Sequence, residues 1–187
     1  MMKYWCDVGH FNLDQANYFI ELLNVHNPNY VLETGFCTGR SAVSLLCNSN
    51  NIKKMISIDI NFNYRKPQGN QYRKLLIDNF NNFYTIEGDS KKIINDNFLK
   101  TEFPNGIDWF TVDGDHSYYG CLTDIELVYK HMNKGGIIII DDYKSGPPNG
   151  CSIPDVTNAC DDFHKKHPDI KKITWNKDGK GFCVFLF

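Results

Sequence analysis

Residues 31–41 read VLETGFCTGRS, and this stretch decides the fold class of the chain. A short apolar run typical of a strand leads into Gly35 and Gly39, and a helical pattern follows directly. Such a strand, loop and helix arrangement lets a ligand approach backbone N–H groups at a helix N-terminus. A tight turn without a ligand explains the two glycines equally well, so the surrounding sequence has to decide between these interpretations.

Strand-like and helical patterns alternate from Tyr30 almost to the end of the chain, which is typical of βαβ units and a mostly parallel sheet. The predicted strands are Tyr30–Thr34, Met55–Ile60, Phe83–Glu87, Ile107–Asp113, Gly136–Asp141, Ile170–Trp175 and Gly181–Phe187. The predicted helices are one that follows Asn12, with Gln15 as its capping-box partner, and Arg40–Cys47, Pro67–Phe80, Lys91–Phe98, Tyr119–Met132 and Pro154–His167.

Only residues 176–180 join the last two predicted strands. A connection this short requires an antiparallel pair, because parallel neighbours need a crossover of about a dozen residues or more. We therefore expect an α/β fold with a Rossmann-like, doubly wound sheet of seven strands, mostly parallel and ending in an antiparallel hairpin. Residues 1–187 are expected to form a single domain, with the helical segment 1–28 packed on it.

Composition excludes several classes of function. The formal net charge is −2 and long runs of Lys or Arg are absent, so we expect no nucleic-acid partner. The longest apolar run, residues 137–140, is far too short to cross a membrane. Seven scattered cysteines without a CxxC pair are typical of reduced thiols, and with no signal peptide they predict a cytoplasmic location.

Two acids near the glycine loop indicate the ligand. Glu33 lies at the strand end where a dinucleotide would place its pyrophosphate, and a carboxylate there repels phosphate and attracts a cationic amine. Asp59 ends the second strand, where an acid commonly accepts the ribose hydroxyls of an adenosine. An adenosine that carries a cationic amine predicts S-adenosylmethionine. The alternative for Asp59 is that it caps the segment that follows.

The third strand also ends in polar residues. Asp89 could accept the adenine amino group, and the Ser90 backbone could contact the ring. The alternative is that Asp89 or Ser90 caps a helix.

A cluster of acids closes the fourth and fifth strands. Neighbouring strands would bring Asp113, Asp141 and Asp142 together at one edge of the sheet. Their mutual repulsion would raise at least one pKa, and a hard divalent cation relieves it, so we predict Mg²⁺, or else Mn²⁺ or Ca²⁺. The alternative is helix capping or an outward orientation, which we prefer for Asp115.

The motifs ExGxxxGxS, SIDI, EGDS, VDGDHSYY and GGIIIIDDY occur in this order. The chain thereby resembles the class I S-adenosylmethionine-dependent methyltransferases. It is most similar to the metal-dependent small-molecule O-methyltransferases of the catechol and caffeoyl-CoA type and to the macrocin-type sugar O-methyltransferases. Cys37 replaces the middle glycine of the commoner loop, as in the catechol type.

The resemblance implies a role for each matching residue. Cofactor binding would fall to Glu33, Gly35, Gly39, Ser41, Asp59, Asp89, Ser90 and Asp113, and metal binding to Asp113, Asp141 and Asp142. His116 lies where the catechol-type enzymes carry a lysine base, and an imidazole can accept a proton at neutral pH. We therefore predict that His116 and Asp113 are catalytic. The alternative is that His116 packs beneath a tyrosine and only binds its own loop.

The predicted function is the metal-dependent methylation of a hydroxyl group on a small molecule such as a sugar, a polyphenol or another diol. Tyr143 and the loop containing Pro147 and Pro148 would overhang the acceptor, and a homodimer could complete the pocket. Two alternatives are a catalytically silent binding module with the same fold and a nicotinamide-dependent oxidoreductase. Against the oxidoreductase stand Glu33 at the phosphate position and the absence of GxGxxG.

Overall fold

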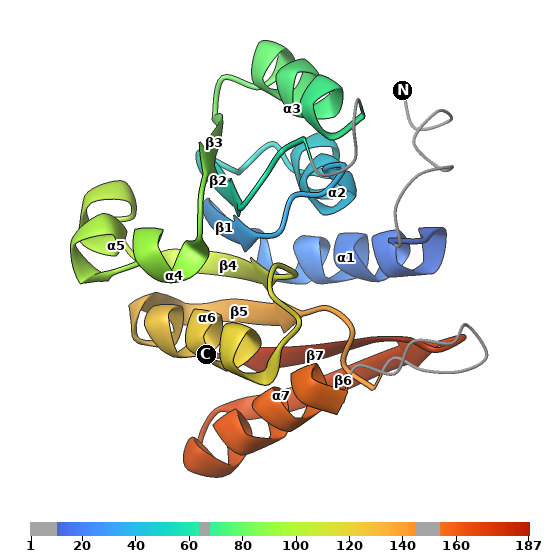
Figure 1. Ribbon diagram of the computed structural model, residues 1–187, viewed down its shortest axis with the longest axis vertical. Coiled ribbons are helices and arrows are strands. Elements are labelled where there is room, and N and C mark those ends of the chain that lie inside the picture. The colour runs from blue at the N-terminus through green and yellow to red at the C-terminus, as the bar shows by residue number, and fades with distance from the viewer. Residues whose placement is uncertain (1–10, 64–67, 145–153) are drawn as a thin grey trace.

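The computed structural model describes residues 11–63, 68–144 and 154–187 (Figure 1). The strands are β1 (Tyr30–Thr34), β2 (Lys54–Asp59), β3 (Phe83–Glu87), β4 (Ile107–Val112), β5 (Met132–Ile140), β6 (Lys171–Lys177) and β7 (Lys180–Leu186). The helices are α1 (Leu13–His26), α2 (Arg40–Asn48), α3 (Gln68–Asn79), α4 (Ser90–Ile93), α5 (Asp96–Glu102), α6 (Tyr118–Val128) and α7 (Pro154–Lys166). A 3₁₀ turn, Tyr129–His131, joins α6 to β5.

The seven strands form one sheet in the order β3-β2-β1-β4-β5-β7-β6. The pairs from β3 through to β5 are parallel, whereas β7 runs antiparallel to both β5 and β6. The predicted mostly parallel sheet with a C-terminal hairpin is therefore confirmed. The chain winds outward in opposite directions from β1 and β4, so the sheet switches direction between these two central strands, where α/β proteins bind ligands.

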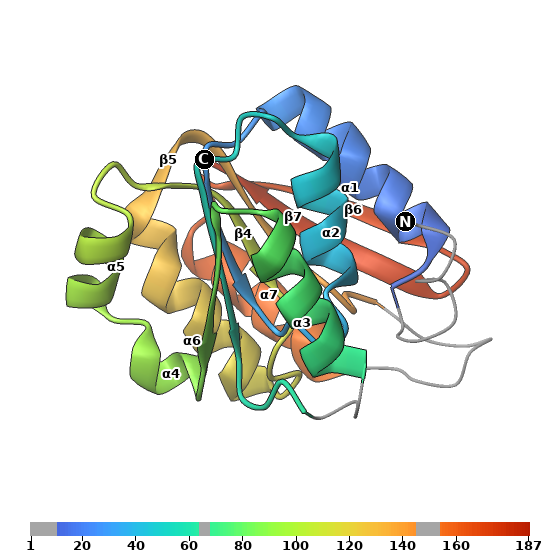
Figure 2. The ribbon, with the colours of Figure 1, turned by 90° about the horizontal axis from the view of Figure 1, so that it is seen from above.

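Helices cover both faces of the sheet (Figure 2). On one face, residues of α1, α2 and α3 pack with Val31, Trp109 and Ile139. On the other, residues of α5, α6 and α7 pack with Leu32 and Phe110. Successive side chains of a strand point to opposite faces, which explains why adjacent residues enter different cores. Two apolar layers fix the central strands and hold their carboxyl ends in place.

The first helix begins with the predicted capping box. The Asn12 side chain accepts from the Gln15 backbone N–H, and the Gln15 side chain accepts from the Asn12 backbone N–H, each at 2.9 Å. These two bonds satisfy backbone donors that every helix start leaves without a partner. Phe19 and Leu23 then anchor α1 on the sheet.

The expectation of one helix over Lys91–Phe98 is wrong. The helix α4 ends at Ile93, Ile94 is extended and buried, and Asn95 starts α5 by accepting from the Phe98 backbone N–H. The Asn side chain offers the backbone a cap that competes with a continuous helix. The predicted helix Tyr119–Met132 likewise ends early, since α6 stops at Val128.

The C-terminal hairpin turns at Asp178 and Gly179. Both residues have positive φ, 51° and 76°, as a two-residue hairpin turn of type I′ requires. The turn is therefore tighter than the predicted connection of residues 176–180. Pro67, Pro147 and Pro148 lie outside the described residues.

None of the helices that the structure describes is both long enough and apolar enough to cross a bilayer. Within the same ranges, Cys47, Cys121, Cys160 and Cys183 are free thiols.

Candidate functional site

The glycine loop lies at the centre of the sheet, between the ends of β1 and β4. Gly35 has a φ of 86°, and a Cβ atom there would lie 2.0 Å from the carbonyl oxygen of Asp113. The Asp113 backbone N–H donates to the Thr34 carbonyl at 2.8 Å, and the Gly35 N–H donates to Ile58 at 2.9 Å. Only glycine permits this close approach, so Gly35 sets the position of Asp113 as well as that of its own loop.

Glu33 is completely buried at the end of β1. Its two carboxylate oxygens accept hydrogen bonds from the hydroxyls of Ser41, on α2, and Ser57, on β2. Burial raises the pKa of Glu33 to about 7, although both hydroxyls favour the charged form. A buried carboxylate in this state gains most from a cationic partner.

Asp59 lies at the end of β2 and binds backbone N–H groups of the glycine loop. Its Oδ2 accepts from the backbone N–H groups of Phe36 at 2.8 Å and Cys37 at 3.0 Å, and its Oδ1 accepts from Asn61 at 2.9 Å. Two carboxylate oxygens offer about four acceptor positions, so Asp59 retains capacity for a ribose hydroxyl. Its predicted ribose contact stays a prediction.

Beyond the end of β3, Asp89 caps a helix, which is one of the two roles that the sequence allowed. Asp89 accepts from the Lys91 backbone N–H at 3.1 Å and caps α4. The Ser90 hydroxyl donates to Asp124, a buried carboxylate on α6, at 2.8 Å. Both residues follow the end of β3, and their contact with adenine stays a prediction.

The N-cap of α2 is Gly39, which has a φ of 72° and no side chain that could cap the helix. The first N–H groups of a helix favour a negative group, such as the carboxylate of an amino-acid ligand. Gly39 and Ser41 thus lie where the predicted ligand end would approach.

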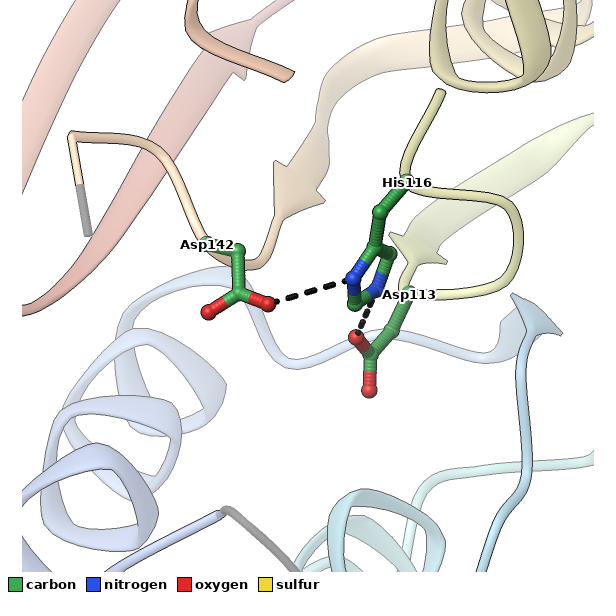
Figure 3. Close-up of side chains that lie close together, drawn as sticks. All are labelled: Asp113, His116 and Asp142. Atoms are coloured by element: carbon green, nitrogen blue, oxygen red, sulfur yellow. Dashed lines mark hydrogen bonds and ion pairs between the residues drawn. The ribbon is translucent and has the colours of Figure 1, made fainter. Parts of the chain in front are cut away.

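Three of the predicted site residues meet where β4 and β5 end (Figure 3). His116 lies between two acids, with Nε2 at 3.1 Å from Asp113 Oδ1 and Nδ1 at 3.3 Å from Asp142 Oδ2. One possible ligand atom from each of the three residues lies within 4.8 Å of the other two. The cluster therefore has the donor spacing that a single cation needs.

Burial and neighbouring charges shift the pKa values of Asp113, His116 and Asp141. The hydrogen bond to Asp113 is the main cause that raises the pKa of His116 to about 9. Burial raises the pKa of Asp113 and, to a greater extent, that of Asp141, which Asp113 and Asp142 also repel. The acids thus repel one another as the sequence predicted, and a protonated His116 partly balances them in the protein without a metal.

Asp141 lies beside this cluster and is only 9% exposed. Its Oδ1 accepts from the side-chain Nε2 of Gln15 at 2.9 Å and from the Asp142 backbone N–H at 2.8 Å. Both of these hydrogen bonds fall on the same oxygen. Oδ2 therefore remains as the oxygen that a cation could take.

Two neighbouring residues have their polar partners outside the cluster of Asp113, His116 and Asp142. Asp115 forms an ion pair with Lys91 at 2.8 Å, and this bond lowers the pKa of Asp115 to about 2. Its position agrees with the outward orientation that we preferred. Tyr143, predicted to overhang the acceptor, is buried in the core instead, and its hydroxyl donates to Asp161 at 2.8 Å. Asp142 has a φ of 60°, and this left-handed turn directs the following residue back into the core.

Sequence reasoning missed three polar partners of the site: Gln15, Ser57 and Asp124. Gln15 was identified only as a capping residue, and Ser57 only as part of a strand. The signal for Ser57 is a hydroxyl on β2 opposite Glu33 in the parallel register, a pairing that requires the strand order. Asp124 is an acid on the otherwise apolar side of α6, and a buried acid of that kind needs a partner.

Solved structures of other proteins share this fold. The O-methyltransferase of Bacillus cereus in complex with S-adenosylhomocysteine matches with a TM-score of 0.75 and 13% identity, over 97% of this chain and 83% of that one. TomG of Streptomyces achromogenes in complex with S-adenosylmethionine matches with 0.73 and 14%, over 97% and 81%. The S-adenosylhomocysteine-bound methyltransferase PaMTH1 of Podospora anserina matches with 0.65 and 18%, over 92% and 77%.

Sequence comparisons give the family. A stretch of 41 residues is 54% identical to the uncharacterized protein R132 of Acanthamoeba polyphaga mimivirus, a match that spans 22% of this chain and 19% of that protein. The model of a methyltransferase-domain family matches residues 32–143, which is more than half of the chain and includes Glu33, Asp113 and Asp142. The resemblance to methyltransferases is thereby confirmed, and the chain belongs to this methyltransferase-domain family.

Proposed function

We propose that this chain is an S-adenosylmethionine-dependent O-methyltransferase that acts on a hydroxyl group of a small molecule with the help of a divalent cation. One observation carries the proposal. The central strands place a buried carboxylate, Glu33, next to the acidic cluster of Asp113 and Asp142 along a single edge of the sheet. Membership of a methyltransferase family supports methyl transfer, and the structural neighbours include O-methyltransferases that bind this cofactor or its product.

The cofactor end of the site would use charge complementarity. The methionyl amine would pair with Glu33, and the methionyl carboxylate would meet the start of α2, after Gly35, Gly39 and Ser41. Asp59 would accept the ribose hydroxyls, and Asp89 with Ser90 would face the adenine. The raised pKa of Glu33 supports this arrangement, because a cationic amine compensates the cost of charging a buried acid.

The metal end would use Asp113, Asp141 and Asp142. Their carboxylate oxygens suit Mg²⁺ or Mn²⁺. The close approach of donor atoms from Asp113, His116 and Asp142, with the Asp141 carboxyl beside them, supports this proposal. Such a cation lowers the pKa of an acceptor hydroxyl and fixes its direction. An acceptor with two adjacent hydroxyls, as in a sugar or a polyphenol, would chelate it best.

His116 would act as the base. In the protein without a metal it is protonated near neutral pH, and an imidazolium cannot accept a proton. A cation held by Asp113 and Asp142 would offset the charge of these acids and would thereby favour the neutral imidazole, the form of His116 that accepts a proton. The acceptor oxygen then bonds to the methyl carbon as the carbon–sulfur bond breaks, His116 takes the hydroxyl proton, and S-adenosylhomocysteine leaves.

We keep the remaining assignments as proposals. The partner is a small-molecule hydroxyl substrate, with neither nucleic acid nor membrane required, and a homodimer could complete the acceptor pocket. A cytoplasmic location agrees with the free thiols of the described residues.

Calorimetry with S-adenosylhomocysteine, followed by turnover on a panel of diols, tests the proposal. We expect product binding and methylation of at least one diol in wild type, and in Asp141→Ala the loss of Mg²⁺ binding but not of product binding. Absence of product binding would contradict the proposal. Binding without turnover or metal dependence would instead support the catalytically silent binding module.

A further inference from the structure

The first helix reaches the acidic cluster through one buried side chain. Gln15 of α1 is fully buried, and its Nε2 donates to Asp141 Oδ1 at 2.9 Å although 126 residues separate the two. Helix α1 is held against the sheet by Phe19 and Leu23, so Gln15 approaches from a fixed position. The N-terminal helix therefore contributes directly to the geometry of the site.

The amide can take only one orientation. Its Oε1 faces the Asn12 backbone N–H at 2.9 Å, and that N–H can only donate. The amide oxygen must therefore point to Asn12, which leaves Nε2 to face Asp141. The capping box thus orients the donor that binds Asp141.

Two donors restrict the Asp141 carboxylate. Gln15 Nε2 and the Asp142 backbone N–H both bind Oδ1, the second at 2.8 Å, which fixes the rotation of the carboxylate and leaves Oδ2 for another partner. An amide is neutral, so it holds the Asp141 side chain by a hydrogen bond and forms no ion pair with it. Such outer partners orient metal ligands and tune their affinity.

We infer that Gln15 is a positioning residue that presents Asp141 to a divalent cation, an inference that rests on the proposed metal-dependent function. Its role differs from helix capping, although the same side chain does both. The capping role uses Oε1 and the positioning role uses Nε2, and a change at Asn12 weakens the cap without removing Gln15 Nε2.

The test compares Gln15→Met with Asn12→Ala in the full chain. Methionine keeps the length and apolar contacts of the side chain but has no amide, so both roles are lost. Asn12→Ala removes one bond of the capping box and keeps the backbone N–H that holds Gln15 Oε1. For both variants, Mn²⁺ binding is measured by electron paramagnetic resonance and S-adenosylhomocysteine binding by calorimetry. Thermal unfolding is measured by circular dichroism.

We expect Gln15→Met to bind Mn²⁺ at least about tenfold more weakly than wild type, as for other outer-shell partners. Product affinity should change less than about twofold, and Asn12→Ala should bind Mn²⁺ as wild type does. Wild-type Mn²⁺ affinity in Gln15→Met, or an equal loss in both variants, would overturn the positioning role alone. Failure of wild type to bind Mn²⁺ would overturn the metal-dependent function and the inference with it.

Discussion

Glu33 and His116 are the residues whose ionisation the site depends on. One is an acid with a pKa raised to about 7 by burial, and the other is a base with a pKa raised to about 9 by a hydrogen-bonded acid. Both shifts bring the groups into or past the neutral range, where a ligand charge can change their protonation. The site can therefore be examined by titration before any acceptor is known.

Product affinity should rise with pH through about 7 in wild type and be weaker and flatter in Glu33→Gln. Only the charged form of the Glu33 carboxyl pairs with the methionyl amine. The fraction of Glu33 in this form grows as pH rises through its pKa. Calorimetry of S-adenosylhomocysteine between about pH 6 and about 8 measures this dependence. The same dependence of product affinity on pH in wild type and Glu33→Gln would show that the amine does not pair with Glu33.

Stability without cofactor should show the opposite dependence. A pKa raised in the folded state stabilises the fold below the unfolded value of 4.5, and this contribution is lost as pH rises through about 7. The shift corresponds to a loss on the order of 3 kcal/mol. Urea unfolding from pH 4.5 to about 8 should therefore show a decline in wild type that Glu33→Gln lacks. Parallel curves for the two proteins would contradict the assignment.

Replacing His116 by Gln should reduce kcat about 10²- to 10⁴-fold, as the loss of a general base does, and leave product binding intact. The free energy of unfolding of the same variant should also lose the part of its pH dependence that comes from His116. The raised pKa of His116 stabilises the fold below its ordinary value of 6.5, and this contribution disappears as pH rises through about 9. Single-turnover kinetics and urea unfolding measure the two effects. Full activity in His116→Gln would show that another group takes the proton.

At the level of elements, the contact between the β1 loop and β4 determines where Asp113 lies. Gly35 and Gly135 share a φ of 86°, but their surroundings differ. A Cβ atom added at Gly35 would lie 2.0 Å from the Asp113 backbone, whereas one added at Gly135 would meet no atom of the described residues within 4 Å. The two glycines form a matched pair. They separate the cost of a left-handed backbone from the cost of steric overlap.

Gly135→Ala should cost about 1 to 2 kcal/mol of unfolding free energy, because a left-handed backbone is strained for any residue that carries a Cβ. Gly35→Ala should cost at least about 2 kcal/mol more, because the added methyl group overlaps the backbone of Asp113 and Gly114. Denaturant unfolding measures both. Equal losses of unfolding free energy in the two variants would contradict this prediction, because they would show that the overlap with the Asp113 backbone costs no stability.

Much of the fold could be predicted from the chain because its elements carry local signals. The short connection between the last two strands predicted the hairpin. Parallel strands that end at the same edge of the sheet predicted that Asp113 and Asp142 lie close together. Tyr143 was placed wrongly because its direction depends on the φ of 60° at Asp142, which no sequence pattern reveals. The helix break at Asn95 was missed because its cap competes with a helical pattern of similar strength.

At the scale of the molecule, the hydrogen bond between Gln15 and Asp141 could not be predicted. It joins the first helix to the end of the fifth strand, and only the packing of α1 on the sheet brings the two side chains together. The doubly wound sheet therefore does more than support the site. It gathers acids from the ends of β1, β2, β4 and β5 at one edge, and it lets an N-terminal helix hold one of them.

A crystal structure with S-adenosylhomocysteine and Mn²⁺, with anomalous scattering recorded at the manganese edge, tests this assembly most directly. We expect one manganese peak between the carboxylates of Asp113, Asp141 and Asp142, with the product amine against Glu33. Product bound at Glu33 with no manganese peak at these acids, or manganese bound elsewhere, would contradict the metal-dependent mechanism.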